Sequence, residues 1–267
     1  FFKQKTAYEI PKRDWSSDVC SSDLGRTATE LRLWDALGAD LLCPFHYFGV
    51  ADNTDLTGLT WSRGRYDDAE LSNLYTGNDA RSAIVVNELR DKVLDLGNMR
   101  GLGFCVGVEH ATYMAKVFNE AGIPAAAVTG QTSPADRQRA IADLRDRRLN
   151  ILFSADVFNE GLDVPDVDTV LLLRPTDSAT IFLQQLGRGL RRTRDKAVLT
   201  VLDFVGFQRR EFQWERKLRA LTGTTRKKLV HQVETGFPFL PSGCQIVLDR
   251  QSQQLILDNI KTQVTPR

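Results

Sequence analysis

The chain has 267 residues, of which 42% are hydrophobic, so it is long enough to bury a core in one large or two small domains. Lysine and arginine number 35 against 34 acidic residues, and the resulting net charge of +1 favours no class of partner for the chain as a whole. No apolar run reaches the roughly 18 residues of a membrane span, and none of the four cysteines forms a CxxC pair, which indicates free thiols in a cytoplasmic protein and argues against a zinc site.

Residues 1–24 do not fit the rest of the chain. They lack periodicity, do not begin with methionine, and resemble translated sequencing-adaptor sequence. We therefore base the fold prediction on residues 25–267. We expect the natural protein to extend upstream of Gly25; the alternative is a disordered natural arm.

Residues 25–98 are expected to be a linker and the end of a preceding region of the protein. Within them, residues 41–50 are aromatic and apolar and predict a strand. Residues 67–70 (DDAE) superficially resemble an acidic metal box, but they are more typical of the first turn of a helix, where carboxylates favour the dipole. Asn78 or Asp79 can cap a helix that runs to about Leu96.

Between residues 99 and 206, short apolar runs alternate with helical patterns. Gly122 is placed to follow a helix, and Ser133 with Pro134 is placed to start one. This alternation predicts an α/β fold with a parallel sheet flanked by helices and right-handed crossovers. Strands are predicted over residues 103–108, 124–129, 150–154, 168–173 and 197–205, and helices over residues 109–121 and 136–147.

Residues 207–267 are expected to be a mainly helical extension. Helices are predicted over residues 207–221 and 226–234, with a turn-rich break at residues 236–243. Residues 245–260 are predicted to begin as a strand and then to form a helix.

The stretch from Arg188 to Lys228 is basic, with thirteen lysine or arginine residues against four acidic ones. Such a block on a neutral chain indicates a polyanionic partner. Phe207, Phe212 and Trp214 could stack on bases, although aromatic residues spaced in this way more often form the apolar face of an amphipathic helix.

The segment QQLGRGLRR carries paired arginines. If it is helical, Gln184, Arg188 and Arg191 lie at i, i+4 and i+7 and share one face. Two guanidinium groups there suit a phosphate group that develops charge, although a solvated basic helix end would also favour the dipole. Gly187 and Gly189 each cost about 1 kcal/mol in a helix interior, which suggests that something approaches the backbone closely.

A polar loop precedes this segment and follows the strand predicted at residues 150–154. Loops at the carboxyl ends of strands are where open α/β sheets bind ligands. Asp163 could accept a hydrogen bond from a ribose hydroxyl or hold an arginine. Asp163 and Glu160 could equally be ordinary polar loop residues.

Together these segments resemble superfamily 2 helicases. FSADVFNEGLDVPDVDTVLLLRP is similar to motif V, and QQLGRGLRR matches the QxxGRxxR pattern of motif VI. FCVGVEHA resembles motif IV, and VTGQTSPADRQRAIADLRD resembles the segment that joins motifs IV and V. The resemblance implies that residues 99–206 form the second of two RecA-like domains. The tail resembles that of bacterial DEAD/DEAH-type helicases related to type III restriction subunits.

The resemblance implies roles for individual residues. Arg188 and Arg191 would be catalytic arginine fingers that face the γ-phosphate, and Gln184 would position them or the attacking water. Many relatives have threonine at the position of Ala155, where it contacts a backbone phosphate of the nucleic acid. In this chain either Ser154 or Asn159 would make that contact, or the nucleic-acid strand is bound more weakly. The expected nucleotide-coupling residues are Glu160, Gly161, Asp163 and Gly187, the expected nucleic-acid contacts are Ser154, Asn159, Thr129, Gly130 and His110, and no metal ligand is expected.

The resemblance also implies ATP and Mg²⁺ as cofactors, bound mainly by an N-terminal RecA-like domain of the same protein. The phosphate-binding pattern GxxxxGK[ST] does not occur in this chain. We therefore expect the second motor domain of an ATP-dependent helicase or translocase, inactive alone, that acts on DNA rather than RNA and has no membrane partner.

Two other readings remain. The first is a non-catalytic DNA- or RNA-binding module that uses the basic block. The second is an unrelated Rossmann-like enzyme, which would need a glycine-rich loop after its first strand. In this chain GLGFCVG precedes and spans a strand instead.

Overall fold

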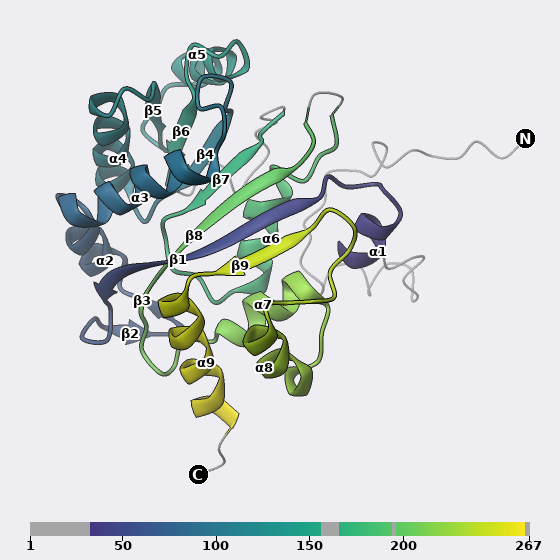
Figure 1. Cartoon of the computed structure of the whole chain (residues 1–267). Helices are drawn as coiled ribbons and strands as arrows, with labels where there is room; N and C mark the ends of the chain where they lie inside the picture. The colour runs from purple at the N-terminus through teal and green to yellow at the C-terminus, as the bar shows by residue number, and fades with distance from the viewer. Residues whose placement is uncertain (1–32, 156–165, 194–195, 265–267) are drawn as a thin grey trace, which may run out of the picture. The chain divides into compact units, whose positions relative to one another are not determined.

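The computed structural model describes residues 33–155, 166–193 and 196–264 (Figure 1). The expectation for residues 1–24 lies outside these ranges. The strands are β1 (Phe45–Asp55), β2 (Trp61–Ser62), β3 (Arg65–Tyr66), β4 (Gly101–Phe104), β5 (Ala125–Val128), β6 (Ile151–Ser154), β7 (Thr169–Leu172), β8 (Leu199–Phe207) and β9 (Gln245–Leu248). The helices are α1 (Leu33–Gly38), α2 (Asp68–Tyr75), α3 (Asp79–Lys92), α4 (Val108–Glu120), α5 (Pro134–Arg145), α6 (Ala179–Gly187), α7 (Trp214–Thr222), α8 (Arg226–Thr235) and α9 (Arg250–Val264).

Within the described residues, seven strands form one sheet in the order β5-β6-β4-β7-β8-β1-β9, and every neighbouring pair is parallel. Strands β2 and β3 form a separate antiparallel ribbon. All four residues of β4, of β6 and of β7 are buried, as expected where helices cover both faces of a sheet. The predicted α/β fold, with a parallel sheet, flanking helices and a helical C-terminal part, is confirmed.

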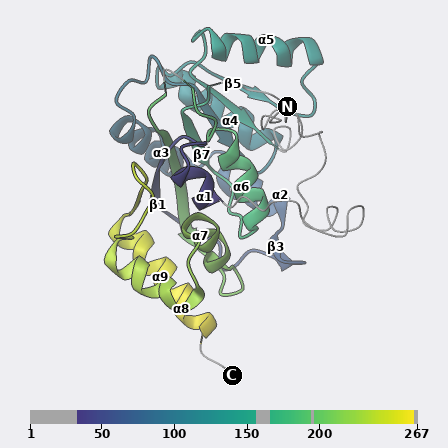
Figure 2. The ribbon, with the colours of Figure 1, turned by 90° about the vertical axis from the view of Figure 1, so that its right-hand side faces the viewer.

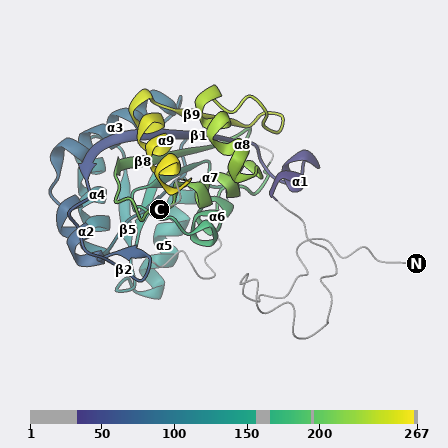
Figure 3. The ribbon, with the colours of Figure 1, turned by 90° about the horizontal axis from the view of Figure 1, so that it is seen from below.

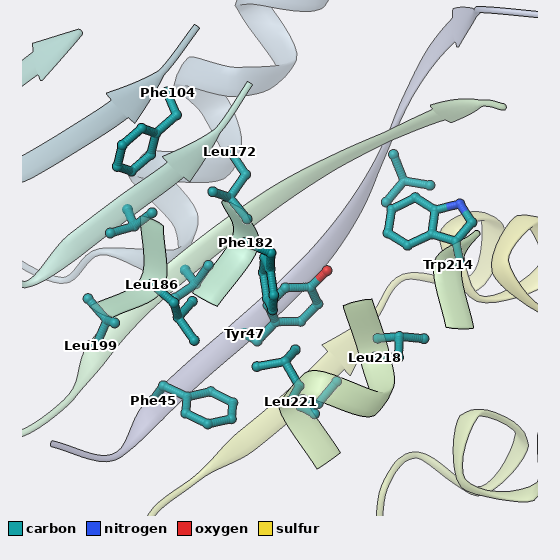
Figure 4. Close-up of a cluster of buried hydrophobic side chains, with 14 of the residues drawn as sticks. Phe45, Tyr47, Phe104, Leu172, Phe182, Leu186, Leu199, Trp214, Leu218 and Leu221 are labelled. Carbon is teal, nitrogen blue, oxygen red and sulfur yellow. The ribbon is translucent and has the colours of Figure 1, made fainter. Parts of the chain in front are cut away.

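Alternate strand residues pack into two cores on opposite faces of the sheet. In β7, Val170 and Leu172 belong to one core, while Leu171 and the following Leu173 belong to the other. Helices α3 and α4 cover the second core, and α6, α7 and α8 cover the first (Figure 3). The first core includes the aromatic rings of Tyr47, Phe182 and Trp214 (Figure 4).

Several predicted helix ends are confirmed by their local hydrogen bonds. The Asn78 side chain accepts from the N–H of Arg81, and Ser133 caps α5 with Pro134 next to it. The Asp67 side chain accepts from the first turn of α2, so residues 67–70 begin a helix, as predicted. These caps involve residues within three positions of each other, which is why the sequence reveals them.

Other predicted ends are wrong. The strand expected at residues 103–108 is β4, which starts at Gly101 and stops before Val108 begins α4. Helix α3 ends at Lys92 rather than near Leu96 because Val93 is extended. The helix expected at residues 207–221 starts later, at α7. The reason is that β8 continues to Phe207, whose carbonyl accepts from Leu56 beside the end of β1.

The expected domain boundaries at residues 98/99 and 206/207 do not divide the fold. Strand β1, which was assigned to a linker, lies between β8 and β9 in the sheet, and α3 packs on the same sheet. Strand β9, from the expected extension, is an edge strand of that sheet. The described residues therefore belong to one compact unit, which begins at Leu33.

The C-terminal helices are attached to this sheet through a buried charged cluster. Asp203 of β8 accepts hydrogen bonds from the Tyr47 hydroxyl of β1 and the Lys217 ammonium of α7. Lys217 also lies 4.9 Å from the ring centroid of Phe182 in α6. Helices α8 and α9 lie side by side, and both contact α7 (Figure 2). Among the described helices, none has the length and apolar composition that crossing a bilayer requires.

Candidate functional site

The described candidate residues lie at two opposite edges of the sheet. Ser154 ends β6, Thr129 and Gly130 follow β5, and His110 lies in the first turns of α4, so all four belong to the carboxyl edge. Residues 188–193, named here the arginine loop, lie at the amino edge. The carbonyl of Leu190 accepts from the N–H of Cys43, just before β1, at 2.9 Å.

The prediction that Gln184, Arg188 and Arg191 share one helical face is wrong. Helix α6 ends at Gly187, with Arg188 as its C-cap residue, and Arg191 forms an isolated antiparallel bridge with Leu42. Pairing of the arginine loop with the segment before β1 replaces the helical hydrogen bonds. Only Gln184 is therefore carried by the helix itself, and both arginines are carried by a paired loop.

The two glycines of this segment have different surroundings. A Cβ atom at Gly189 would collide with Cδ1 of Leu199, the first residue of β8. The close approach predicted at Gly189 is therefore made by the chain's own core. Gly187 is exposed, and a Cβ atom there would meet nothing within 4 Å. Gly187 consequently leaves open space beside Arg188.

The side chains of the arginine loop differ in exposure. Arg191 and Arg192 are exposed, whereas Arg188 and Gln184 are half-buried. Arg192 is tied back to the loop before β1, since its Nη1 donates to the Asp40 carbonyl at 2.8 Å and lies 3.0 Å from its carboxylate. Arg188 and Arg191 are thus presented from a backbone that is fixed by neighbouring strands and loops.

Asn159, Glu160, Gly161 and Asp163 lie outside the described residues, so their proposed contacts to nucleotide and nucleic acid stay predictions.

At the carboxyl edge, the segment after β5 is a tight turn. Thr129 donates its N–H to Thr132 Oγ1 at 2.9 Å, and its own Oγ1 accepts from the Gln131 N–H at 3.2 Å. Gly130 at the tip is exposed, with open space where a Cβ would be. Ser154 is buried, and its Oγ has no hydrogen-bond partner within the described part of the chain.

His110 does not fit the predicted nucleic-acid contact. Its side chain is fully buried, and Nδ1 accepts from the Val106 N–H at 3.3 Å. Burial, and secondarily the charge of Arg81, lowers the pKa of His110 to about 3. The imidazole is therefore a neutral core group in this conformation.

Two buried ion pairs were not anticipated from the sequence. Arg81 Nε lies 2.7 Å from the Asp52 carboxylate, with both side chains almost fully buried, and Lys217 pairs with Asp203. An aspartate inside an apolar strand, such as Asp203 in AVLTVLDFV, is the one signal that could have indicated a buried pair. Its partner lies on another element and carries no such signal.

The basic block is less basic at the surface than its sequence suggests. Lys196 and Lys217 are buried, and Glu215 pairs with both Arg219 and Arg226.

The aromatic residues of the block also turn inward. Phe212 and Trp214 belong to the core, as expected for the apolar face of an amphipathic helix, and Phe207 is partly exposed.

The described residues contain no group of three or more histidine, cysteine, aspartate or glutamate side chains that could hold a metal ion. Their three cysteines, Cys43, Cys105 and Cys244, are free. The donors gathered at the amino edge are guanidinium groups, which suit anionic phosphate oxygens.

Residues 84–193 match the family model described as "Helicase conserved C-terminal domain". A putative ATP-dependent helicase, IRC3 of Saccharomyces cerevisiae, is 29% identical over 165 residues, which are 62% of this chain and 24% of that protein. A 51.5 kDa protein of a Lactococcus phage is 29% identical over 161 residues, which are 60% of this chain and 34% of the phage protein. The chain thus spans about a quarter to a third of the length of these relatives.

Among solved structures, the ATP-dependent Type ISP restriction-modification enzyme LlaBIII bound to DNA matches 94% of this chain and 19% of its own chain, with a TM-score of 0.57 and 14% identity. At that identity the two share a fold. The segment matched by the family model runs from α3 to the end of the arginine loop and contains both candidate edges. Residues 84–193 are therefore similar to helicase C-terminal domains, and IRC3, one of the relatives that the chain matches, is a putative ATP-dependent helicase.

Proposed function

We propose that this chain is the second motor domain of an ATP-dependent nucleic-acid helicase or translocase. In this proposal a first motor domain of the same protein binds most of the ATP and Mg²⁺, and this chain supplies arginine fingers and contacts to the nucleic acid. The observation that carries the proposal is the arginine loop, which presents Arg188 and Arg191 from a fixed backbone.

A fixed pair of guanidinium groups suits phosphoryl transfer. Donors that are already in place stabilise developing charge on phosphate oxygens without the cost of reorganisation. The open space beside Gly187 would admit a phosphate group close to the backbone. Gln184, in the last turn of α6, would position the arginines or the attacking water. Bound ATP would supply the phosphoryl group, and Mg²⁺ would neutralise charge on its phosphates.

The carboxyl edge is the proposed nucleic-acid side. Thr129, Gly130 and Ser154 end neighbouring strands there, and the exposed backbone of Gly130 suits a phosphate contact, whereas the side chains of Thr129 and Ser154 are buried in this conformation. The preference for DNA follows from the resemblance to helicases related to restriction subunits. A binding competition between single-stranded DNA and RNA of the same sequence tests this preference for DNA.

The test of this function is Arg188→Ala in the full-length protein that joins this chain to its first motor domain. ATP binding should stay nearly intact, and kcat should fall by about 10³-fold or more, the range of known arginine fingers. Arg139→Ala is the control, because Arg139 is exposed on α5 and pairs only loosely with Asp136, at 3.5 Å. Wild-type turnover in Arg188→Ala would refute the finger assignment.

The alternative is a non-catalytic binding module, for which we expect a different dependence of nucleic-acid affinity on salt and ATP. Arg216, Lys227 and Lys228 are exposed on α7 and α8 and could hold nucleic-acid phosphates. Affinity that falls steeply with salt and does not respond to ATP would favour that reading. ATP-dependent affinity, lost on substitution of Arg188, would favour the motor.

A further inference from the structure

Lys196 is a buried lysine that contacts both segments that resemble helicase motifs V and VI. It is 8% exposed, and its Nζ donates to the Gly189 carbonyl at 2.5 Å and to the Val167 carbonyl at 3.0 Å. Gly189 lies in the arginine loop between Arg188 and Arg191. Val167 belongs to the segment that resembles motif V and lies two residues before β7. One ammonium group therefore joins the two segments.

The position is costly for a lysine, which indicates that its hydrogen bonds matter. Burial lowers the pKa of Lys196, and the nearby Cys43 side chain and the carboxyl groups of Asp168 and Asp166 oppose this shift. Both carboxylates are shared with Arg100, whose N–H donates to Asp168 at 3.1 Å and whose guanidinium lies 3.4 Å from Asp166. An apolar side chain would fill the same space without the desolvation penalty, but it could not hold two carbonyl groups.

Gly189 is held on three sides. The Leu199 side chain occupies the space that a Cβ of Gly189 would need, the Gly189 N–H donates to the Leu186 carbonyl at 2.9 Å, and Lys196 binds the Gly189 carbonyl. A displacement of Gly189 would move both neighbouring arginines, because they are one and two residues away. Angular errors of 10–20° or shifts of about 0.5 Å are enough to impair a catalytic constellation.

We propose that Lys196 is a positioning residue that links the motif V segment to the arginine loop and thereby fixes Arg188 and Arg191 in their working place. This inference rests on the proposed motor function, since it assigns a task to Lys196 only if the two arginines act on a phosphate.

The first test uses the 267-residue chain and hydrogen exchange. In Lys196→Met, the amides of Gly189 and Cys43, whose hydrogen bonds define the arginine loop, should exchange at least tenfold faster than in the wild type. The amides of Gly101 and Cys105, which bond to the β6 side of the sheet, should keep their rates. Val233→Ala, a core substitution in α8, controls for a general loss of stability.

Equal exchange at Gly189 in Lys196→Met and wild type would overturn the proposal. If Lys196→Met does not fold, Lys196→Gln replaces it, because the amide can still donate to one carbonyl. Its Gly189 exchange should then lie above that of the wild type, and a wild-type rate would also overturn the proposal.

The second test is a double-mutant cycle on ATP turnover in the full-length protein. Lys196→Met should lower kcat at least tenfold while changing KM for ATP less than threefold. The double variant with Arg188→Ala should be no slower than Arg188→Ala alone, because both substitutions remove the same interaction. Additive losses would overturn the positioning role. Normal turnover of Arg188→Ala would instead refute the arginine-finger role in the proposed function, so the two failures are distinguishable.

Discussion

The two nitrogen atoms of the buried His110 ring have different surroundings. Nδ1 accepts from the Val106 N–H, while Nε2 has no partner within the part of the chain that the structure describes. The ring centroid lies 5.3 Å from that of Tyr75, and the Arg81 guanidinium lies 3.8 Å from the centroid of Tyr75 on its face. A second positive charge on the imidazole would be buried beside that cation, so the neutral form is strongly favoured.

This environment predicts a pH dependence of stability. The pKa of His110 is about 3 in the folded chain and near 6.5 when unfolded, so between these values the unfolded state binds more protons. Stability should therefore fall as the pH decreases below about 6.5, by at most about 1.4 kcal/mol per pH unit from this residue. Guanidinium unfolding of wild type and His110→Gln at pH 7, 6, 5 and 4 measures the difference.

The comparison is made between the two slopes, because carboxyl groups also titrate in this range. His110→Gln keeps an acceptor for the Val106 N–H but has no titrating group. A slope in the variant as steep as that of the wild type would contradict the assignment of the shift to His110.

At the scale of single residues, the sequence revealed chemistry but not partners. Asp203 was visible as an acid in an apolar strand, yet its bond to Lys217 depends on how α7 packs, which no local pattern encodes. His110 was assigned to the nucleic acid because of its place in a motif, although the fold buries it. The position of His110 in the sequence therefore correctly predicted that it lies at the carboxyl edge of the sheet. It could not predict that the side chain points into the core.

At the scale of elements, the end of α6 shows how tertiary pairing overrides helical periodicity. The spacing of Gln184, Arg188 and Arg191 is helical, but the helix stops at Gly187. The local cap of α5 at Ser133 was predictable because both of its partners lie in the same few residues. The end of α6 was not, because it depends on the segment that precedes β1.

The two glycines of this segment should respond differently to alanine. Gly189→Ala forces Leu199 to move and should lower the free energy of unfolding by about 1–3 kcal/mol. Gly187→Ala adds a methyl group in open space and should leave the stability unchanged or raise it by less than about 1 kcal/mol. Urea unfolding followed by circular dichroism measures both.

Leu199→Ala supplies the control for the Gly189 substitution. Combined with Gly189→Ala, it should destabilise the chain by less than the sum of the single effects, because the smaller side chain removes the collision. If Gly187→Ala lowered the free energy of unfolding more than Gly189→Ala does, this result would contradict the packing described for the arginine loop.

At the scale of the whole molecule, the order of strands in the sheet differs from their order in the chain. The alternating pattern of residues 99–206 correctly predicted a parallel sheet, because each strand and helix there is a local βαβ repeat. The insertion of β1 between β8 and β9 joins segments about 150 and 200 residues apart and leaves no local trace. For this reason the expected domain boundaries did not correspond to the fold.

The assembled sheet predicts that residues 207–267 cannot be removed. Their loss would strip β9 from β1, expose the core around Tyr47, and remove Lys217, the charge partner of Asp203. The fully buried side chains of Trp214, Leu218 and Leu221 would be lost from the core, at roughly 1.5–3 kcal/mol each. A total of that size is comparable with the ~5–15 kcal/mol that stabilises a typical domain.

Residues 1–206 should therefore lack a cooperative thermal transition and a dispersed amide spectrum, whereas residues 1–267 should unfold in one step by circular dichroism and by tryptophan fluorescence. Lys217→Met in the intact chain separates the two causes, because it removes the charge partner of Asp203 while it keeps α7 in place. If residues 1–206 folded with the stability of the intact chain, the C-terminal helices would be an independent module, and the position of β1 beside β9 would have no energetic weight.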